Sequence, residues 1–396
     1  MASNTWLVVH GLWLVVVVLV ARSTHQRLWR RVLATLAVLL FIFSAFQTQG
    51  VLSDDALRYH WDGWIGVHGV DPYAQVPEHE TLAPYHVEAN GIAYPGEVPY
   101  ADLPTVYPPG AQLLFSGIAS VVGVNALGWK LIWCSVLAIL LTLIHRHLRD
   151  HERRWFWLVL VSPFFLVHAV ADLHLDALMA CLTALALLKV RGRQFVFGGI
   201  LLGLAICVKY APLVAVPFLL LTLSWRQRVL VLGAVTLTIG LVFAPYVNSQ
   251  IWGDLQNFLT NWKANAAVYD VARMLLPDRT QTRIALSLVV LVISFIIWRR
   301  WKHQPETLVA LAMMIFLISS PVIHAWYLLS VVMLLPMAPL RSTIVWMATV
   351  GIYAVFVEIY RTTGTWEEPP VLLALEALPV IAAYVIDVRR GPITAS

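Results

Sequence analysis

Four short segments of the chain place acidic, basic, histidine and aromatic side chains directly beside apolar runs. Ionisable groups at the edge of a membrane are costly to place, so each is a candidate functional residue. A carboxylate there can act as general base on a hydroxyl, and a cation can bind a phosphate. The four segments contain Asp54, Asp55, Arg58, Tyr59, His60 and Asp62; His168, Asp172, His174 and Asp176; Lys209 and Tyr210; and His324, Trp326 and Tyr327.

Each segment also has a purely structural interpretation. The two adjacent aspartates could cap a helix, although two carboxylates exceed what a cap needs. His174 and Asp176 could begin a helix, Lys209 could extend its ammonium to the membrane interface, and His324 could be satisfied at a helix end. The remaining acids of the first loop are interpreted as solvated charges: Asp62, Asp71, Glu78, Glu80 and Glu88.

The composition indicates a polytopic membrane protein. Of 396 residues, 60% are hydrophobic and only 12% are charged, with a mean hydropathy of +0.76. A soluble domain could not cover its surface with so few charges, and a net charge of +5 does not indicate nucleic-acid binding. The three cysteines all lie inside apolar runs, so we expect neither a disulfide framework nor a cysteine metal site. The first apolar run lacks a basic stretch before it and is interpreted as a retained helix.

We expect an all-α bundle of about 12–13 transmembrane helices that forms one domain over residues 1–396. The expected spans are about 5–21, 32–52, 127–147, 155–171, 173–190, 229–246, 283–299, 307–323, 326–341, 343–359 and 371–388. Residues 196–223 are predicted to form a hairpin of two short helices with Lys209 near its tip. Residues 108–123 are predicted to be a re-entrant or interfacial helix, with a full crossing as the alternative.

Charge distribution assigns the two sides of the membrane. One set of short loops holds most of the 27 Lys and Arg but, among the 22 acids, only Asp150, Glu152, Glu306 and Asp387. The positive-inside rule makes that side cytoplasmic. The opposite side carries two long ordered loops, about 53–107 and 246–283, and all four polar segments. Within the first loop, the apolar spacing of DALRYHWDGWIGVH predicts an amphipathic helix over about 55–68 on the membrane surface.

These residues resemble a known family. SDDALRYHWDGWIGVHGVDPY followed by PTVYPPGAQLLF is similar to the first outer loop of bacterial GT-C glycosyltransferases, in the polyprenyl-phosphate-mannose-dependent mannosyltransferase-like group. HLDALMACLTALALL, GGILLGLAICVKYAPLVAVPFLLL and SPVIHAWYLLSVVMLLP resemble three later segments of that group. One difference is Asp62-Gly63-Trp64, where the family commonly has Asp-Gly-Arg, so a cation is missing there.

The resemblance implies an inverting, single-displacement transfer from a β-linked polyprenyl-phosphate sugar at the outer face. Asp55 precedes Tyr59 by four positions, as the family's catalytic Asp often does, so Asp55 ranks first as general base and Asp54 second. Lys209 matches the family's lysine on the short hairpin and His324 matches its late histidine, so both are expected to contact donor phosphate or sugar. The expected substrate-binding residues are Arg58, Tyr59, Trp61, Tyr107, His174, Asp176, Lys209, His324, Trp326 and Tyr327.

The expected partners are a polyprenyl-phosphate sugar, a lipid-linked or glycan acceptor and the bilayer of the bacterial inner membrane, with no nucleic acid. No Gly-rich nucleotide fingerprint is present, which argues against a nucleotide-sugar donor. No cofactor is expected and the sequence requires no divalent metal, although it leaves metal dependence open. One alternative is a lipid or sugar transporter or flippase, which would place charges near the midplane and often show internal repeats. Another is a glycan polymerase or ligase that uses a lipid-pyrophosphate donor. The sequence leaves the sugar and the acceptor open, with mannose as the family-level expectation.

Overall fold

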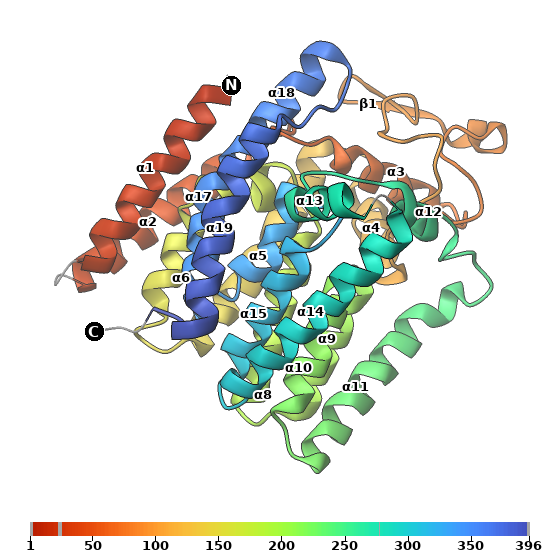
Figure 1. Cartoon of the computed structure of the whole chain (residues 1–396). Helices are drawn as coiled ribbons and strands as arrows, with labels where there is room; N and C mark the ends of the chain where they lie inside the picture. The colour runs from red at the N-terminus through yellow and green to blue at the C-terminus, as the bar shows by residue number, and fades with distance from the viewer. Residues whose placement is uncertain (1–2, 23–25, 277, 394–396) are drawn as a thin grey trace.

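The protein is helical along nearly all of the described chain, which comprises residues 3–22, 26–276 and 278–393 of this computed structural model. Within these ranges, strands are confined to one antiparallel hairpin of β1 (Val87–Ala89) and β2 (Ile92–Tyr94). The predicted all-α class is therefore confirmed. Figure 1 shows long helices running side by side, with shorter elements gathered at one end.

The chain is a multi-pass membrane protein. Among the described residues, six helical stretches are long and apolar enough to cross a bilayer: Arg27–Ala45, Ala126–His147, Trp225–Tyr246, Arg279–Trp301, Arg341–Thr363 and Pro370–Arg390. The pair Arg153–Leu160 and Pro163–Ala171, which bends by 59°, forms either a broken span or a re-entrant segment. The predicted total of about 12–13 therefore includes helices shorter than the roughly 20 residues of a straight crossing.

The membrane body contains most of the helices. They are α1 (Ser3–Arg22), α2 (Gln26–Ala45), α5 (Ala126–His147), α6 (Arg153–Leu160), α7 (Pro163–Phe165), the π-helical η2 (Leu166–Ala171), α8 (Asp176–Arg191), α11 (Trp225–Phe243), α14 (Arg279–Trp301), α15 (Pro305–Ile318), α17 (Arg341–Thr349), η6 (Val350–Ile352), α18 (Tyr353–Thr363) and α19 (Pro370–Arg390). Helix α8 is apolar on nearly all sides and almost completely buried. It therefore forms part of the core against which the polar segments are positioned.

One predicted span is interrupted. The segment expected to cross at about 326–341 forms a 3-10 turn, η5 (Ala325–Leu328), then the single-turn helix α16 (Leu329–Val332) and further turns. Pro336 explains why α16 ends at Val332, because in a continuing helix proline would lack the N–H and clash with the carbonyl four residues before it. This short-turn structure places the preceding residues at the outer end of the bundle.

The predicted hairpin around Lys209 is confirmed. Helix α9 (Phe195–Val208) ends at Lys209, whose backbone is extended, and the chain returns through η3 (Ala211–Val214) and α10 (Ala215–Leu221). Pro212 stands in the first turn of η3, where its missing N–H leaves no helical bond unmade. The lysine is therefore held at the junction of two short helices.

The first outer loop begins with α3 (Asp55–Val67), which confirms the helix predicted there. Helix α3 is not a surface helix, however, because it buries Arg58 and Asp62 together with its apolar side chains. The loop continues through η1 (Glu80–Tyr85) and the β-hairpin.

The segment predicted to be re-entrant or interfacial forms α4 (Pro109–Val122). At 14 residues its length is about 21 Å, less than the roughly 30 Å apolar core of a bilayer. Helix α4 packs against α3 so closely that a Cβ on Gly63 would lie 2.5 Å from the carbonyl oxygen of Phe115. The glycine is therefore required by the contact between the two helices.

The second outer loop contains η4 (Ala244–Tyr246), α12 (Gly253–Asn261) and α13 (Ala267–Leu275). It joins the body through a parallel bridge between Ala264 and Val322, with a backbone hydrogen bond of 2.7 Å from the Ile323 N–H to the Ala264 carbonyl. Figure 1 places α12 and α13 at the same end of the molecule as β1, with the C-terminus toward the opposite end. Both long loops therefore lie at one end, as the charge pattern predicted.

Candidate active site

Asp55 is the acidic residue that faces the converging polar groups. Asp54 occupies the N-cap position of α3 and is exposed, and the Ser53 hydroxyl accepts a hydrogen bond of 3.2 Å from the Asp55 N–H. The side chain of Asp55 is 23% exposed, and its Oδ2 atom lies 3.7 Å from Nδ1 of His174. Burial raises the pKa of the Asp55 carboxyl to about 6, although the Lys209 ammonium opposes this rise. The carboxylate is partly accessible and ionised at neutral pH, as a general base requires.

A stack of three rings forms one wall beside Asp55. His174 stacks on Trp326 with ring centroids 3.9 Å apart. The His324 ring is parallel to the same indole, with ring centroids 4.6 Å apart. The Nδ1 atom of His324 is 3.0 Å from the hydroxyl of Tyr353, a residue of α18. Residues from three distant parts of the chain are therefore fixed in one aromatic array.

Lys209 supplies a cation to the same site. Its ammonium forms an ion pair with Asp176, the first residue of α8, and lies 4.6 Å from the ring centroid of Tyr327. Asp176 is buried, whereas the lysine side chain is 20% exposed. The lysine can therefore present charge to an anionic ligand while the ion pair holds it in position.

Tyrosines from the first outer loop form part of the surroundings. The Tyr59 ring is stacked on Phe115 at 4.7 Å and contacts the edge of Tyr107 at 5.1 Å. Tyr59 is buried and Tyr107 half-buried, and the Tyr107 carbonyl accepts a hydrogen bond of 2.7 Å from the Tyr73 hydroxyl. These contacts order the loop that carries Asp55.

Two predicted binding residues have other contacts. Arg58 forms a 2.8 Å ion pair with Asp62, and its guanidinium donates to the carbonyls of Tyr100 and Leu103. Trp61 is completely buried in a separate apolar cluster of the first loop. In this structure, the two side chains stabilise the loop.

The interpretation of Asp62 as a solvated loop charge was wrong. Its side chain is 1% exposed and accepts hydrogen bonds from Arg58 and from the Gln112 amide at 2.9 Å. Sequence spacing placed Asp62 on α3 but did not reveal that α4 covers that face. A buried carboxylate is tolerated here because it is both paired and hydrogen-bonded.

Lys130 was missed by the sequence analysis. It lies in α5, is 1% exposed, and donates to the backbone carbonyls of Val170 and Ala171. The turn after Ala171 contains Asp172, whose carboxylate accepts hydrogen bonds from the backbone N–H groups of Val51 and Leu52. The signal available in the sequence was a lysine inside an apolar segment, where a charged side chain is a functional candidate by default.

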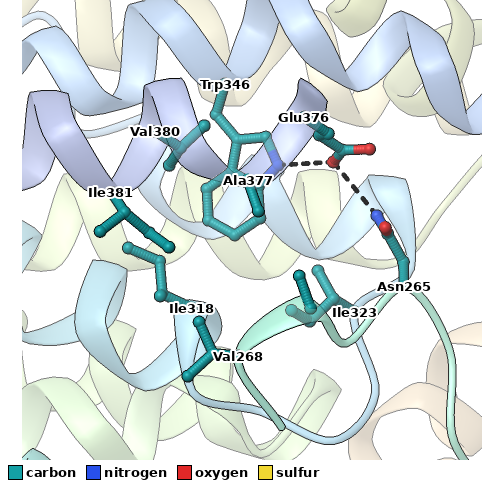
Figure 2. A pocket seen from close by; sticks show the side chains of 10 residues that line it. Asn265, Val268, Ile318, Ile323, Trp346, Glu376, Ala377, Val380 and Ile381 are labelled. Atoms are coloured by element: carbon teal, nitrogen blue, oxygen red, sulfur yellow. Dashed lines mark hydrogen bonds between the residues drawn. The ribbon is translucent and has the colours of Figure 1, made fainter. Parts of the chain in front are cut away.

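A second residue that the sequence analysis missed, Glu376 of α19, lines the pocket in Figure 2. Its Oε1 atom accepts hydrogen bonds from the Trp346 indole at 2.8 Å and the Asn265 amide at 3.1 Å. Ile323, which precedes His324, lines the same pocket, but Asp55 does not. The pocket therefore adjoins the aromatic wall without containing the candidate base.

The assembled site can deprotonate a hydroxyl at Asp55 and bind an anion at Lys209. A family model described as "Alpha-(1->6)-mannopyranosyltransferase, N-terminal domain" matches residues 1–225, more than half of the sequence. The chain belongs to this family. The match includes Asp55, His174 and Lys209, and it confirms the mannosyltransferase-like resemblance seen in the sequence motifs. The segment with His324 lies beyond the matched residues.

Individual relatives are more distant. The chain is 26% identical over 101 residues to Alpha-(1->6)-mannopyranosyltransferase A of Corynebacterium glutamicum, a match that covers 26% of this chain and 19% of that protein. It thus spans about a fifth of the curated relative's length. The crystal structure of ArnT from Cupriavidus metallidurans bound to undecaprenyl phosphate aligns with 12% identity and a TM-score of 0.45, covering 91% of this chain and 76% of ArnT.

Proposed function

We propose that the protein is an inverting glycosyltransferase that moves a mannosyl group from a polyprenyl-phosphate donor to a hydroxyl of a lipid-linked or glycan acceptor. The observation that carries this proposal is the partly exposed Asp55 carboxylate opposite the Lys209–Asp176 pair. Membership of the mannopyranosyltransferase family supports the sugar and the reaction class.

The transfer is one displacement. Asp55 accepts the proton of the acceptor hydroxyl while the oxygen attacks the anomeric carbon, and the bond from that carbon to the phosphate oxygen breaks. Polyprenyl phosphate leaves with the bonding electron pair, and Lys209 stabilises its increased negative charge. The half-buried Tyr327 is the aromatic side chain available to the sugar, because Trp326 is buried in its stack with His174 and His324.

The product and the membrane face follow from separate arguments. The family name specifies α-(1→6) mannosyl linkages, which inversion of a β-linked donor would produce. The basic loops at the opposite end favour an extracytoplasmic site in the inner membrane. On this arrangement the polyprenyl chain stays in the bilayer while the acceptor approaches from outside.

The experiment uses purified protein in nanodiscs with polyprenyl-phosphate mannose and short α-(1→6)-mannosyl glycolipid acceptors. We expect an elongated product with an α anomeric signal by NMR, lost in Asp55→Asn and retained in Asp54→Asn. A β-linked product would overturn inversion, and full activity in Asp55→Asn would overturn the base assignment. Movement of donor between liposome leaflets without any elongated product would instead indicate a transporter.

A further inference from the structure

Three buried side chains beside the proposed site have the chemistry of metal ligands. His168 of η2, Asp172 of the following turn and His174 each offer a ligand atom, and these atoms all lie within 4.8 Å of one another. Two imidazoles and one carboxylate are a frequent protein ligand set for Zn²⁺, which leaves one coordination position open. The transfer step proposed above gives neither His168 nor Asp172 a role.

The imidazoles have nitrogen atoms without hydrogen-bond partners among the described residues. Both nitrogens of His174 and Nδ1 of His168 are buried and make no hydrogen bond, and the side chains are only 0% and 4% exposed. Buried polar side chains in proteins are nearly always hydrogen-bonded, and exceptions call for an explanation such as an ion. Coordination of a cation would use these nitrogens as electron-pair donors.

Neighbouring groups hold the three side chains in place. The Asp172 carboxylate is oriented by the backbone N–H groups of Val51 and Leu52, and the His174 ring is held against Trp326. Such supporting contacts fix the orientation of metal ligands and contribute to metal affinity. The cluster therefore has the rigidity that a coordination site requires.

The local charge is also favourable to a cation. The carboxylates of Asp55, Asp172 and Asp176 lie in one buried region with the ammonium groups of Lys130 and Lys209. These groups carry one net negative charge when all are ionised. A divalent ion would reverse that sign and favour an anionic phosphate.

We propose that His168, Asp172 and His174 form a binding site for a divalent cation of the Zn²⁺ type. The cation links the end of η2 to the start of α8 and lies next to Asp55, whose carboxylate is 3.7 Å from His174. It fixes the turn between these helices and adds positive charge to the active site. No metal was expected from the sequence, because the cysteines offered no ligand spacing and the histidines were considered only as polar site residues.

The first test measures metal content in protein purified without chelator from cells grown with added zinc. We expect about one equivalent of zinc per chain, falling below about a tenth of an equivalent in His168→Ala and Asp172→Asn. The matched control is His324→Ala, which removes the imidazole on Trp326 outside the cluster and should retain the metal. Equal zinc in His168→Ala and in the wild type would overturn the proposal.

The second test does not depend on whether the variants fold. Chelator-treated wild-type protein is titrated with Co²⁺, and we expect visible absorption of a four-coordinate site that saturates at about one equivalent and is displaced by Zn²⁺. Asp55→Asn should give the same spectrum, which separates this site from the proposed transfer chemistry. Absence of saturable Co²⁺ and Zn²⁺ binding in the wild type would overturn the site even if mannosyl transfer is observed.

Discussion

The two ends of the helix bundle use buried acids in different ways. At the basic end, Glu152 accepts two hydrogen bonds from Arg191 at 2.6 and 3.0 Å. Asp387 accepts hydrogen bonds from the backbone N–H groups of Arg341 and Ser342, and from the Ser342 hydroxyl at 2.8 Å. These acids have their acceptor capacity filled by the protein itself.

At the outer end, Asp55 is left incompletely bonded, although Asp62 and Asp172 there accept hydrogen bonds from the protein. Asp55 lies 3.7 Å from a histidine whose two nitrogens make no hydrogen bond within the described chain. Saturated acids stabilise a fold because burial is compensated, whereas unsaturated ones retain capacity for a substrate or an ion. The comparison suggests a criterion: an acid whose acceptor atoms are not filled by the protein is the better candidate for a functional role.

The largest effect on activity is expected from substitution of Asp55, the incompletely bonded acid of the outer end. Asp55→Asn keeps the shape of the side chain but removes the base, so we expect kcat to fall roughly 10²–10⁴-fold. The denaturant midpoint of unfolding, measured in detergent, should not fall in this variant. The raised pKa of Asp55 means that ionising the wild-type carboxylate above pH 6 costs folding free energy, and the amide avoids that cost. Loss of stability in parallel with activity would contradict the proposed difference between the ends.

The reciprocal variant is Asp387→Ala at the basic end. It leaves the buried N–H and hydroxyl of Ser342 without their acceptor, and each such unsatisfied group typically costs about 1–3 kcal/mol. We expect a large loss of folded protein in detergent unfolding, with kcat per folded molecule unchanged. A normal unfolding midpoint with reduced kcat would show that Asp387 acts in the reaction and does not mainly stabilise the fold.

Lys209 tests the cation of the outer end. Lys209→Met retains an unbranched apolar side chain over Tyr327 and removes the charge, so donor KM should rise about tenfold or more, with a smaller loss in kcat. Kinetics at varied donor concentration separate the two parameters. Lys263→Met is the matched control, because that lysine pairs with Asp270 and Glu368 in the second outer loop.

The pH dependence follows from the raised pKa of Asp55. The carboxylate must be ionised to accept a proton, so kcat/KM should be level above pH about 6 and fall about tenfold per unit below it. A series of initial rates in buffers of constant ionic strength gives the profile. A profile that stays level down to pH 4.5 would exclude this carboxyl as the base.

The smallest effect is expected at Asp54. Its carboxylate is exposed at the N-cap of α3 and forms no side-chain cap hydrogen bond, so Asp54→Asn should change kcat/KM less than about twofold. The amide preserves N-cap compatibility. A loss as large as that of Asp55→Asn would show that the two aspartates act as one unit.

The sequence predicted the elements that carry the outer cluster because their signals are local. The length of the apolar stretch 196–223 and its break at residues 209–212 located the hairpin, and helical spacing located α3. The uneven distribution of Lys and Arg between the loops predicted that Asp55, His174 and Lys209 lie at one end, and the structure places them there. The catalytic and binding roles of these residues stay predictions.

The remaining features depend on tertiary contacts that spacing does not encode. Arg58 and Asp62 looked accessible because the cover by α4 could not be read from α3 alone. Lys130 and Glu376 each stand alone in an apolar segment, and their partners are up to 111 residues away in the sequence. Helix α8 is apolar on nearly all sides, so periodicity could not indicate which neighbours it contacts.

The hydrogen bonds from Val51 and Leu52 to Asp172 have a mechanical consequence. Residues 51 and 52 connect α2, a membrane-crossing helix, to α3, which begins with Asp55. Because this connection is hydrogen-bonded to the turn before α8, we expect tilting of α2 in a thinner or thicker bilayer to move Asp55 little. The distance between Asp55 and His174 should therefore be insensitive to lipid chain length.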